Sequence, residues 1–316
     1  MNDTRVRLSR RSFCAAAAGA AAASFLAGPS RAAPVKRRFI DMHTHLGQCW
    51  NHTRELTAAD LLKWMDEHDI ERAIVMPVVS PEASTYPLTP DFVLAQTKPH
   101  RDRLIPFCVV DPRTAYTGGR HGLRYVLRKY AEQGAKGFGE HKPGVAIDDP
   151  RNMELYAVCG EVKLPVLFHL DEQRNTDVAG LPGLERVLQK NPDTTFIGHG
   201  PGWWASISGG ISDADLGAYP KTPVAPGGAI DRLMDKYPNL YGELSAGSGA
   251  GAISRDLAFG KQFLIRRADR IMFGTDYLSP GQEIPQFDIF PQIDLPEEVA
   301  AKVYRGNAIR ALGLED

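Results

Sequence analysis

Short apolar segments alternate along the chain with longer segments of helical periodicity. Eight apolar segments have the length and composition of strands, and they are RRFIDMH, RAIVMPVV, RLIPFCVV, AKGFGE, LPVLFHL, TTFIGH, NLYGELS and RIMFGTD. Their carboxyl ends fall near residues 43, 79, 110, 140, 169, 199, 244 and 276. Most repeats are therefore about 30 residues long, the size of a strand plus a returning helix, so we predict parallel strands with right-handed crossovers.

Helix-start signals lie between these strands. Thr57 precedes a helical segment and Asp60 follows it by three residues, as in a capping box. Asp149 is a second cap, with Pro150 at the first helical position. Eight strand–helix units predict an α/β protein folded as a single (β/α)8 TIM barrel. The alternative is an open doubly wound sheet, but HTHLGQCW after the first strand lacks the G-x-G-x-x-G phosphate loop.

The first 32 residues do not belong to this pattern. Arg10 and Arg11 precede an apolar, alanine-rich segment that ends in small residues near Ala32. We therefore predict a twin-arginine-type signal peptide over residues 1–32, with the barrel over 33–316, and location in the periplasm or outside the cell. A membrane anchor is the alternative, but Gly19 interrupts the segment, which is shorter than the ~20 apolar residues of a membrane span.

Composition narrows the class of partner. The chain has 316 residues, a net charge of −1 and 43% hydrophobic residues, as in ordinary globular proteins. This neutrality gives no reason to expect nucleic acid or a stable association with anionic membranes. We expect a small-molecule substrate and the twin-arginine export machinery as partners, and leave homo-oligomer formation open. Cys49, Cys108 and Cys159 match no zinc motif, and the last two are expected to be core thiols.

Side chains able to bind a metal recur where the predicted strands end. His43 and His45 are two residues apart on the first strand, so they point the same way. The full set comprises His43, His45, Glu140, His169, His199 and Asp276. The carboxyl ends of barrel strands meet at one mouth. Any one of these residues alone would be ordinary, but together they predict a divalent metal site with a position open to water.

The order of these residues resembles the metal-dependent amidohydrolase superfamily, in particular its amidohydrolase-related branch (amidohydrolase 2). The resemblance covers residues 37–313 and includes FIDMHTHLG, FGTDY and VYRGNAIRALGL. It implies divalent metal ligands, usually to zinc, at His43, His45, His169 and Asp276. It also implies that His199 polarises the substrate carbonyl when one ion is present, or binds a second ion when there are two.

Glu140 decides between one ion and two. Binuclear relatives bridge their metals with a carboxylated lysine or a glutamate, and AKGFGEHKPG places Glu140 at the end of the fourth strand. The alternative is an ion pair between Glu140 and Lys136 or Lys142. We favour Glu140 as a ligand, facing the same side as Phe138 and Lys142. Zinc is the expected metal, with manganese as the alternative.

The chemistry expected of this site is hydrolysis of a small-molecule ester, lactone or amide. A bound ion lowers the pKa of water, and Asp276 is placed to transfer its proton. A metal-dependent decarboxylase of small or aromatic acids is the alternative, and a binding module without activity is the third possibility. A decarboxylase requires a cation for the substrate carboxylate, for which Arg54 is the candidate. Residues 200–228 form a long loop in which Trp203 and Trp204 are expected to line the substrate mouth.

Overall fold

A computed structural model describes residues 39–49, 52–114 and 118–315 of the chain. The predicted leader, residues 1–32, lies outside the described residues, so export remains a prediction. Along the described segments, no helix combines the length and the apolar character needed to cross a membrane.

Eight parallel strands form the centre of the molecule, as the sequence predicts. They are β1 (Phe39–Thr44), β2 (Ile70–Val75), β3 (Leu104–Pro106), β4 (Phe138–His141), β5 (Val166–His169), β6 (Phe196–His199), β7 (Leu240–Glu243) and β8 (Ile271–Met272). Backbone pairing follows sequence order, β1 to β3 in one group and β4 to β8 in the other. The register of β5 and β6 places His169 directly beside His199.

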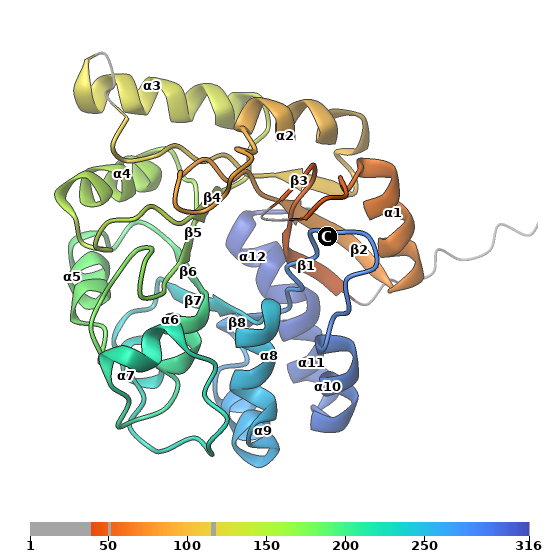
Figure 1. The fold of residues 1–316 in the computed structure, drawn as a ribbon, viewed down its shortest axis with the longest axis vertical. Coiled ribbons are helices and arrows are strands. Elements are labelled where there is room, and N and C mark those ends of the chain that lie inside the picture. Colours follow the sequence, from red (N-terminus) through yellow and green to blue (C-terminus); the bar gives the residue numbers. More distant parts are fainter. Residues whose placement is uncertain (1–38, 50–51, 115–117, 316) are drawn as a thin grey trace, which may run out of the picture. The chain divides into compact units, whose positions relative to one another are not determined.

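Backbone hydrogen bonds join the two groups of strands at both seams. Cys108 N donates to Gly137 O over 2.9 Å, and Gly139 N donates to Cys108 O over 2.8 Å, so β3 is connected to β4. Met42 N donates to Phe273 O over 3.0 Å, which connects β1 to the chain after β8. The sheet therefore closes into the predicted (β/α)8 barrel, seen end-on in Figure 1, and the open doubly wound sheet is excluded.

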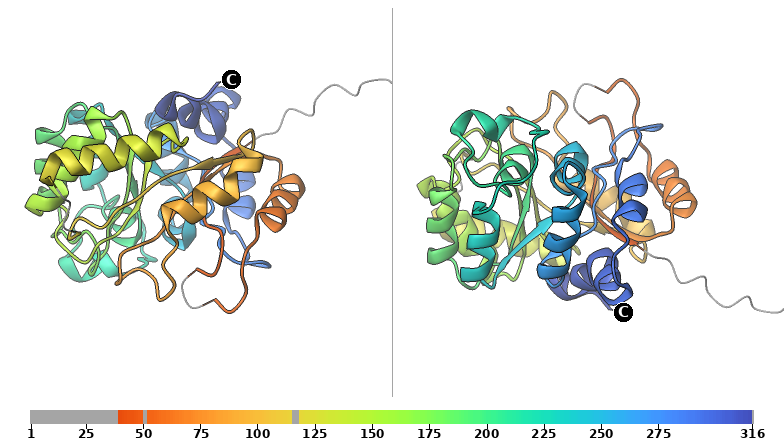
Figure 2. Two further views of the ribbon diagram at one scale, coloured as in Figure 1. Left: turned by 90° about the horizontal axis from the view of Figure 1, so that it is seen from above. Right: turned by 90° about the horizontal axis from the view of Figure 1, so that it is seen from below.

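Helices surround the barrel (Figure 2). They are α1 (Ala58–Glu67), α2 (Pro90–Thr97), α3 (Gly119–Glu132), α4 (Pro150–Glu161), α5 (Pro182–Lys190), α6 (Pro201–Ala205), α7 (Ala229–Lys236), α8 (Ala246–Ser254), α9 (Leu257–Arg266), α10 (Gln286–Ile293), α11 (Glu297–Ala301) and α12 (Asn307–Leu312). The predicted helix starts are confirmed: Thr57 and Asp60 form a capping box on α1, and Asp149 caps α4 ahead of Pro150.

Apolar side chains fill the barrel interior below the strand ends. Ile40 and Met42 of β1 belong to this inner cluster, and Ala308 and Leu312 of α12 pack against it. The larger core lies between the strands and the surrounding helices, and includes the buried thiols of Cys108 and Cys159. With the interior filled by hydrocarbon, the carboxyl ends of the strands remain for polar side chains.

Candidate metal centre

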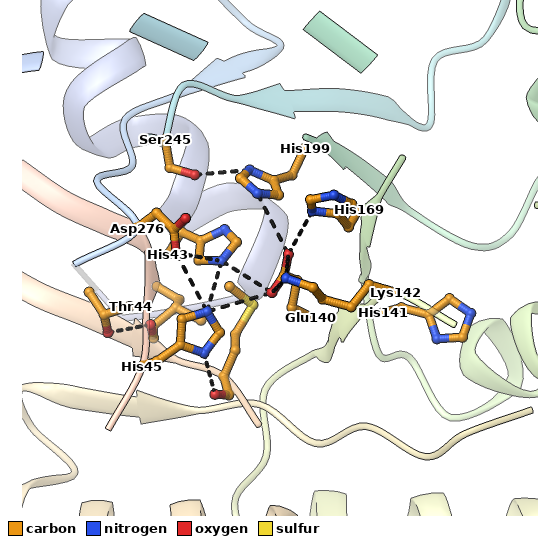
Figure 3. Close-up of polar contacts among 12 residues, drawn as sticks. His43, Thr44, His45, Glu140, His141, Lys142, His169, His199, Ser245 and Asp276 are labelled. Atoms are coloured by element: carbon orange, nitrogen blue, oxygen red, sulfur yellow. Dashed lines mark hydrogen bonds and ion pairs between the residues drawn. The ribbon is translucent and has the colours of Figure 1, made fainter. Parts of the chain in front are cut away.

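All six predicted ligands meet at the carboxyl ends of the strands (Figure 3). The histidines and the glutamate are buried, and the side chain of Asp276 is 18% exposed. Three groups of three have ligand atoms close enough to share an ion. Two of them consist of predicted ligands, namely His43, His45 and Asp276, and Glu140, His169 and His199, and the third combines His43 and His199 with Glu243. Asp276 is therefore the member of the cluster through which the site reaches the solvent.

The first pair of histidines turns its two Nε2 atoms toward the same point. His43 Nδ1 is 3.0 Å from Glu243 Oε1, and His45 Nδ1 is 2.9 Å from the Met76 carbonyl oxygen, so both Nδ1–H groups donate outward. The two Nε2 atoms then face each other at 3.2 Å, so at most one of them carries a proton. Asp276 Oδ1 lies 3.4 Å and 3.6 Å from these nitrogens. This geometry fits a shared cation.

Glu243, at the end of β7, is a site residue that we did not predict. Its Oε1 lies 2.6 Å from His199 Nδ1 and 2.9 Å from Ser245 Oγ, in addition to its contact with His43. One carboxylate thus fixes the orientation of two imidazoles and leaves Nε2 of His199 free to bind an ion. The signal was present in the sequence, because NLYGELS places a glutamate at a strand end.

Asp171 is the second residue that we missed, and it orients His169. Asp171 Oδ2 lies 2.8 Å from His169 Nε2, and Arg174 holds the same carboxylate through Nε at 2.9 Å. The other nitrogen of His169, Nδ1, is 2.9 Å from Glu140 Oε1. The signal here was the two-residue spacing of His169 and Asp171, which matches that of His43 and His45.

Glu140 lies between the two ligand groups. Its Oε2 is 3.6 Å from His45 Nε2, and its Oε1 is 3.6 Å from His199 Nε2. Lys142 Nζ also donates to both oxygens, over 2.9 Å and 2.8 Å, so the ion pair we considered as the alternative is present as well. Each carboxylate oxygen has two lone pairs, so Lys142 does not exclude a metal.

The expectation that Phe138 shares the face of Glu140 is wrong. The pairing of β4 with β5 shifts register between Phe138 and His141, which breaks the simple alternation of faces. Phe138 belongs to the outer core, with its ring 5.3 Å from that of His141. His141 points away from the site as expected, toward Asn152 of α4.

Asp276 is held in place by the backbone of β1. Thr275 donates through Oγ1 to Asp41 Oδ2 over 2.6 Å and through its backbone N to Asp41 Oδ1 over 3.0 Å. Asp276 N donates to His43 O over 2.9 Å. Asp276 itself has a φ of +60°, a left-handed conformation that non-glycine residues adopt rarely and often at functional sites. Asp41 and Thr275 thus position Asp276.

The electrostatics of the cluster favour a cation. Burial and the nearby charge of His43 lower the pKa of His45 to about 4, and burial lowers the pKa of His199. Burial acts in the same direction on His43, but the charges of Asp276 and Glu243 outweigh it and raise its pKa well above the ordinary value. The carboxylates therefore stabilise positive charge at the point where the imidazoles converge, and a divalent ion can replace a proton there.

The tryptophan pair lies elsewhere than we expected. Trp203 and Trp204 are 0% and 1% exposed. A Cβ on Gly198 would lie 2.4 Å from the ring of Trp203, so this ring packs on the outer face of β6, opposite His199. Trp204 Nε1 donates to the Glu243 carbonyl oxygen over 3.0 Å. The expectation that both rings line the substrate mouth is therefore wrong for Trp203, which belongs to the outer core, whereas Trp204 is equally buried but also lines a cavity beside α8.

Arg54, the other predicted substrate-binding residue, is exposed in the loop between β1 and α1. The structure does not bring it into the group of side chains drawn in Figure 3. Its proposed contact with a substrate carboxylate remains a prediction.

Comparison with solved structures places the chain among known barrels. A probable 2-pyrone-4,6-dicarboxylic acid hydrolase from Acinetobacter baumannii has 14% identity and a TM-score of 0.59, over 88% of this chain and 100% of that one. An amidohydrolase from Burkholderia multivorans with bound zinc has 15% identity and a TM-score of 0.59, over 88% and 99%. A 5-carboxyvanillate decarboxylase from Sphingomonas paucimobilis has 13% identity and a TM-score of 0.56, over 88% and 100%.

These identities are low, so the likeness to solved structures establishes the fold. No curated protein matches the sequence at a significant level. The family model described as amidohydrolase matches residues 40–314, which include every member of the histidine and carboxylate cluster. The chain therefore belongs to the amidohydrolase family.

Proposed function

We propose that the protein is a metal-dependent hydrolase of a small-molecule ester, lactone or amide, with zinc or manganese as its ion. One observation carries this proposal. Each of the four imidazoles has one ring nitrogen on an acceptor at the edge of the site, and its other nitrogen faces the centre. Metal-binding histidines have this arrangement, because the outer acceptor fixes the ring and its tautomer.

The ligand groups favour two ions. His43, His45 and Asp276 would hold one, His169 and His199 the other, and Glu140 would bridge them with one oxygen toward each group. The hydrogen bond from His199 Nδ1 to Glu243 leaves a lone pair on Nε2, so we assign His199 as a ligand rather than as a donor to the substrate carbonyl. Zinc and manganese both accept this mixture of imidazole and carboxylate.

Divalent metal bound here would acidify a water molecule near neutral pH and polarise a substrate oxygen. Asp276 is the residue placed to move the proton, because its side chain is partly exposed while Oδ1 points at the two Nε2 atoms. Its carboxylate takes a proton from the attacking water and returns it to the leaving group. Lys142 Nζ, held at Glu140, supplies positive charge beside the developing oxyanion.

A two-part experiment tests this proposal. The protein loaded with zinc or manganese is assayed on a panel of lactones, esters and amides and on a panel of aromatic acids, and its metal content is measured by elemental analysis. We expect hydrolysis and two ions per chain, falling to one or none in Glu140→Gln. Glu154 is an exposed glutamate of α4, and Glu154→Gln, the matched control, should keep two ions per chain. One ion in both wild type and Glu140→Gln, with activity largely kept, removes Glu140 from the site.

A non-oxidative decarboxylase is the second candidate, supported by the similarity in fold to the 5-carboxyvanillate decarboxylase. In that reaction Asp276 would donate its proton to carbon instead of to a leaving oxygen or nitrogen. Turnover of the aromatic acids with release of carbon dioxide, and no hydrolysis of the first panel, would favour this reaction over hydrolysis.

A further inference from the structure

A cavity of about 340 Å³ lies between α6, α8 and the segment 218–221. Its wall is largely apolar, with Trp204 and Pro201 of α6 on one side, and Tyr219 completes it. This volume is in the range of pockets that hold small molecules. In Figure 1, α6 and α8 lie close to each other on the side of the barrel where β6 to β8 end.

Arg255 brings an unpaired guanidinium to this cavity. Its Nη1 donates to the Pro220 carbonyl oxygen over 3.1 Å. Nε and Nη2 are buried, and neither has a hydrogen-bond partner within the described part of the chain. Burial lowers the pKa of Arg255, with no neighbouring carboxylate to offset the effect. Arg255 as a whole is half-buried, and leaving its buried nitrogens without a partner is costly, so an anionic partner is implied.

The edge of Arg255 that carries Nε and Nη2 is covered but has no hydrogen-bond partner among the described residues, and it has the geometry of a carboxylate fork. Arg113 uses the same two nitrogens, Nε and Nη2, to bind both oxygens of Asp111, over 2.8 Å and 2.7 Å. Arg151 binds Asp149 in the same way, over 2.8 Å for each contact. In Arg255 this edge has no partner in the described part of the chain. Its two parallel N–H groups match a carboxylate better than a single acceptor.

Ser248 adds a second donor on the same helix face. It lines the cavity, is 6% exposed, and its Oγ has no partner in the described segments. Ser248, Gly251, Ala252 and Arg255 follow the i, i+3, i+4, i+7 pattern, so α8 presents one face to the cavity. The two small residues leave room between the polar ones, and the arginine side chain leans back toward the amino end of α8.

The cavity is connected to the metal centre through α8 and Tyr219. Ser245 immediately precedes α8, and its Oγ is 2.9 Å from His199 Nδ1 (Figure 3). Tyr219 lines the cavity, and a Cβ on Gly247 would lie 3.5 Å from its ring. Burial raises the pKa of Tyr219, and the charges of Asp276 and Asp171 raise it further. Tyr219 thus lies within electrostatic reach of the mouth of the metal site.

We propose that this Arg255 cavity binds the carboxylate of a small acid with a flat apolar body, and that the side chains of Arg255 and Ser248 turn toward the ligand so that Nε, Nη2 and Oγ donate to it. The body of the acid packs against Trp204 and Tyr219. The inference rests on the proposed function in one respect, since it identifies the substrate of the metal centre as a carboxylate-bearing ester, lactone or amide. Binding of the carboxylate itself does not require the ions.

Calorimetric titration of the metal-loaded protein with benzoate tests the cavity. We expect Arg255→Gln to weaken binding by about 10- to 100-fold, because a charge-assisted bidentate contact is lost. Arg255→Lys keeps the positive charge but not the two parallel N–H groups. Its affinity for benzoate should lie between those of the wild type and Arg255→Gln. Arg128→Gln, an exposed arginine of α3, is the matched control and should bind as wild type does. Benzamide, the neutral analogue, should bind weakly and without dependence on Arg255.

Equal benzoate affinity in wild type and Arg255→Gln, or no binding to wild type, would overturn the proposal. Inorganic phosphate is titrated in parallel, and phosphate binding that exceeds benzoate binding would contradict the choice of a carboxylate. If Arg255→Gln does not fold, Ser248→Leu serves instead, because its larger side chain enters the cavity while the guanidinium is kept. Benzoate affinity unchanged by Ser248→Leu would then overturn the proposal.

The metal-free double variant His43→Ala/His45→Ala separates this inference from the proposed function. The cavity shares no lining residue with the metal ligands, so this variant should still bind benzoate in an Arg255-dependent way. Retained binding without hydrolysis by the wild-type enzyme would mean that the cavity inference holds and the hydrolase proposal fails. If the wild type hydrolyses its substrate but neither protein binds benzoate, the hydrolase proposal holds and the cavity inference fails.

Discussion

The metal centre and the Arg255 cavity both use residues of the turn and helix that follow β7, but they differ in how their polar groups are paired. At the metal centre, Glu243 and Asp171 satisfy the outer nitrogens of the imidazoles. At the cavity, two N–H groups of Arg255 and the hydroxyl of Ser248 have no partner among the described residues. The first region is arranged in advance around a cation, while the second presents donors for an acceptor that comes from outside.

The charged groups of the two regions also differ in how many partners hold them. The carboxylates of the metal centre are tied to imidazoles, to Lys142 and to backbone N–H groups, so the site is rigid before any ion enters. Among the described residues, the guanidinium of Arg255 is tied at one nitrogen only. Substitutions in the first region should therefore affect metal content, and those in the second should affect ligand binding alone.

The largest effect is expected for the double variant His43→Ala/His45→Ala. Removal of an outer partner of a metal ligand typically costs about 10- to 100-fold in affinity or activity, so removal of two ligands should exceed about 100-fold. The apolar neighbours on β1 remain, so the barrel should still fold. Elemental analysis and activity measure the result, with exposed His121→Ala as control. Stoichiometric metal in the purified variant would show that these histidines are not ligands.

The next largest effect, a loss of stability, is expected for Trp204, which lies between the cavity and the metal centre. Trp204 contributes its ring to the cavity and donates to the Glu243 carbonyl oxygen behind the metal centre. We expect Trp204→Ala to lower the free energy of unfolding by ~3–5 kcal/mol, as for a buried tryptophan. Tyr125→Ala, at a position 68% exposed, should change it by less than ~0.5 kcal/mol. Urea unfolding compares them. A small loss for Trp204→Ala would contradict its place in the core.

His141 is adjacent to Glu140 but points away from the metal centre, toward Asn152. Burial lowers its pKa from 6.5 to about 4, so it is neutral in the folded protein. The unfolded chain takes up a proton below pH 6.5 while the folded one does not, so stability falls as the pH drops from 6.5 to 4. The loss attributable to His141 is about 3 kcal/mol.

Urea unfolding at pH 7, 5.5 and 4 measures this loss. His141→Asn is expected to start less stable at pH 7, because the hydrogen bond to Asn152 is disturbed, but to lose about 3 kcal/mol less on acidification than the wild type does. Parallel curves for the two proteins would mean that His141 is not the group that titrates.

The smallest effect is expected for Glu243→Gln. Glutamine keeps an acceptor oxygen for one imidazole but removes the charge that now serves His43 and His199. Metal affinity should fall by about 10- to 100-fold, measured by competition with a chelator. Benzoate binding at the Arg255 cavity should be unchanged, since Glu243 does not line it. If Glu243→Gln lost benzoate binding but kept its metal affinity, Glu243 would serve the Arg255 cavity and not the metal centre.

The four histidines of the metal centre could be predicted from the sequence. His43, His45, His169 and His199 were found because each ends a strand, and a parallel barrel brings all strand ends to one mouth. Glu243 obeys the same rule and was overlooked. Asp171 lies two residues beyond His169, a spacing that we applied to β1 but not to β5.

The prediction that both tryptophans line the mouth was wrong for a different reason. Position after β6 places Trp203 and Trp204 near the rim, but α6 begins at Pro201 and carries both rings onto the outside of the barrel. The direction of a side chain in so short a helix is decided by the surfaces around it. Here Gly198 and Gly242 leave room for the ring of Trp203 against the strands.

The elements of the barrel and the chemical types of the side chains at its mouth could be read from local sequence patterns. Strand periodicity, the capping box at Thr57 and the histidines and carboxylates at strand ends are local features, and the backbone alone carries them to a common place. The pairing of these groups follows from packing. Glu243 reaches His43 across 200 positions of sequence, and Arg255 lacks a carboxylate because no described element packed around it supplies one. Such partners depend on packing between distant segments, which local pattern does not specify.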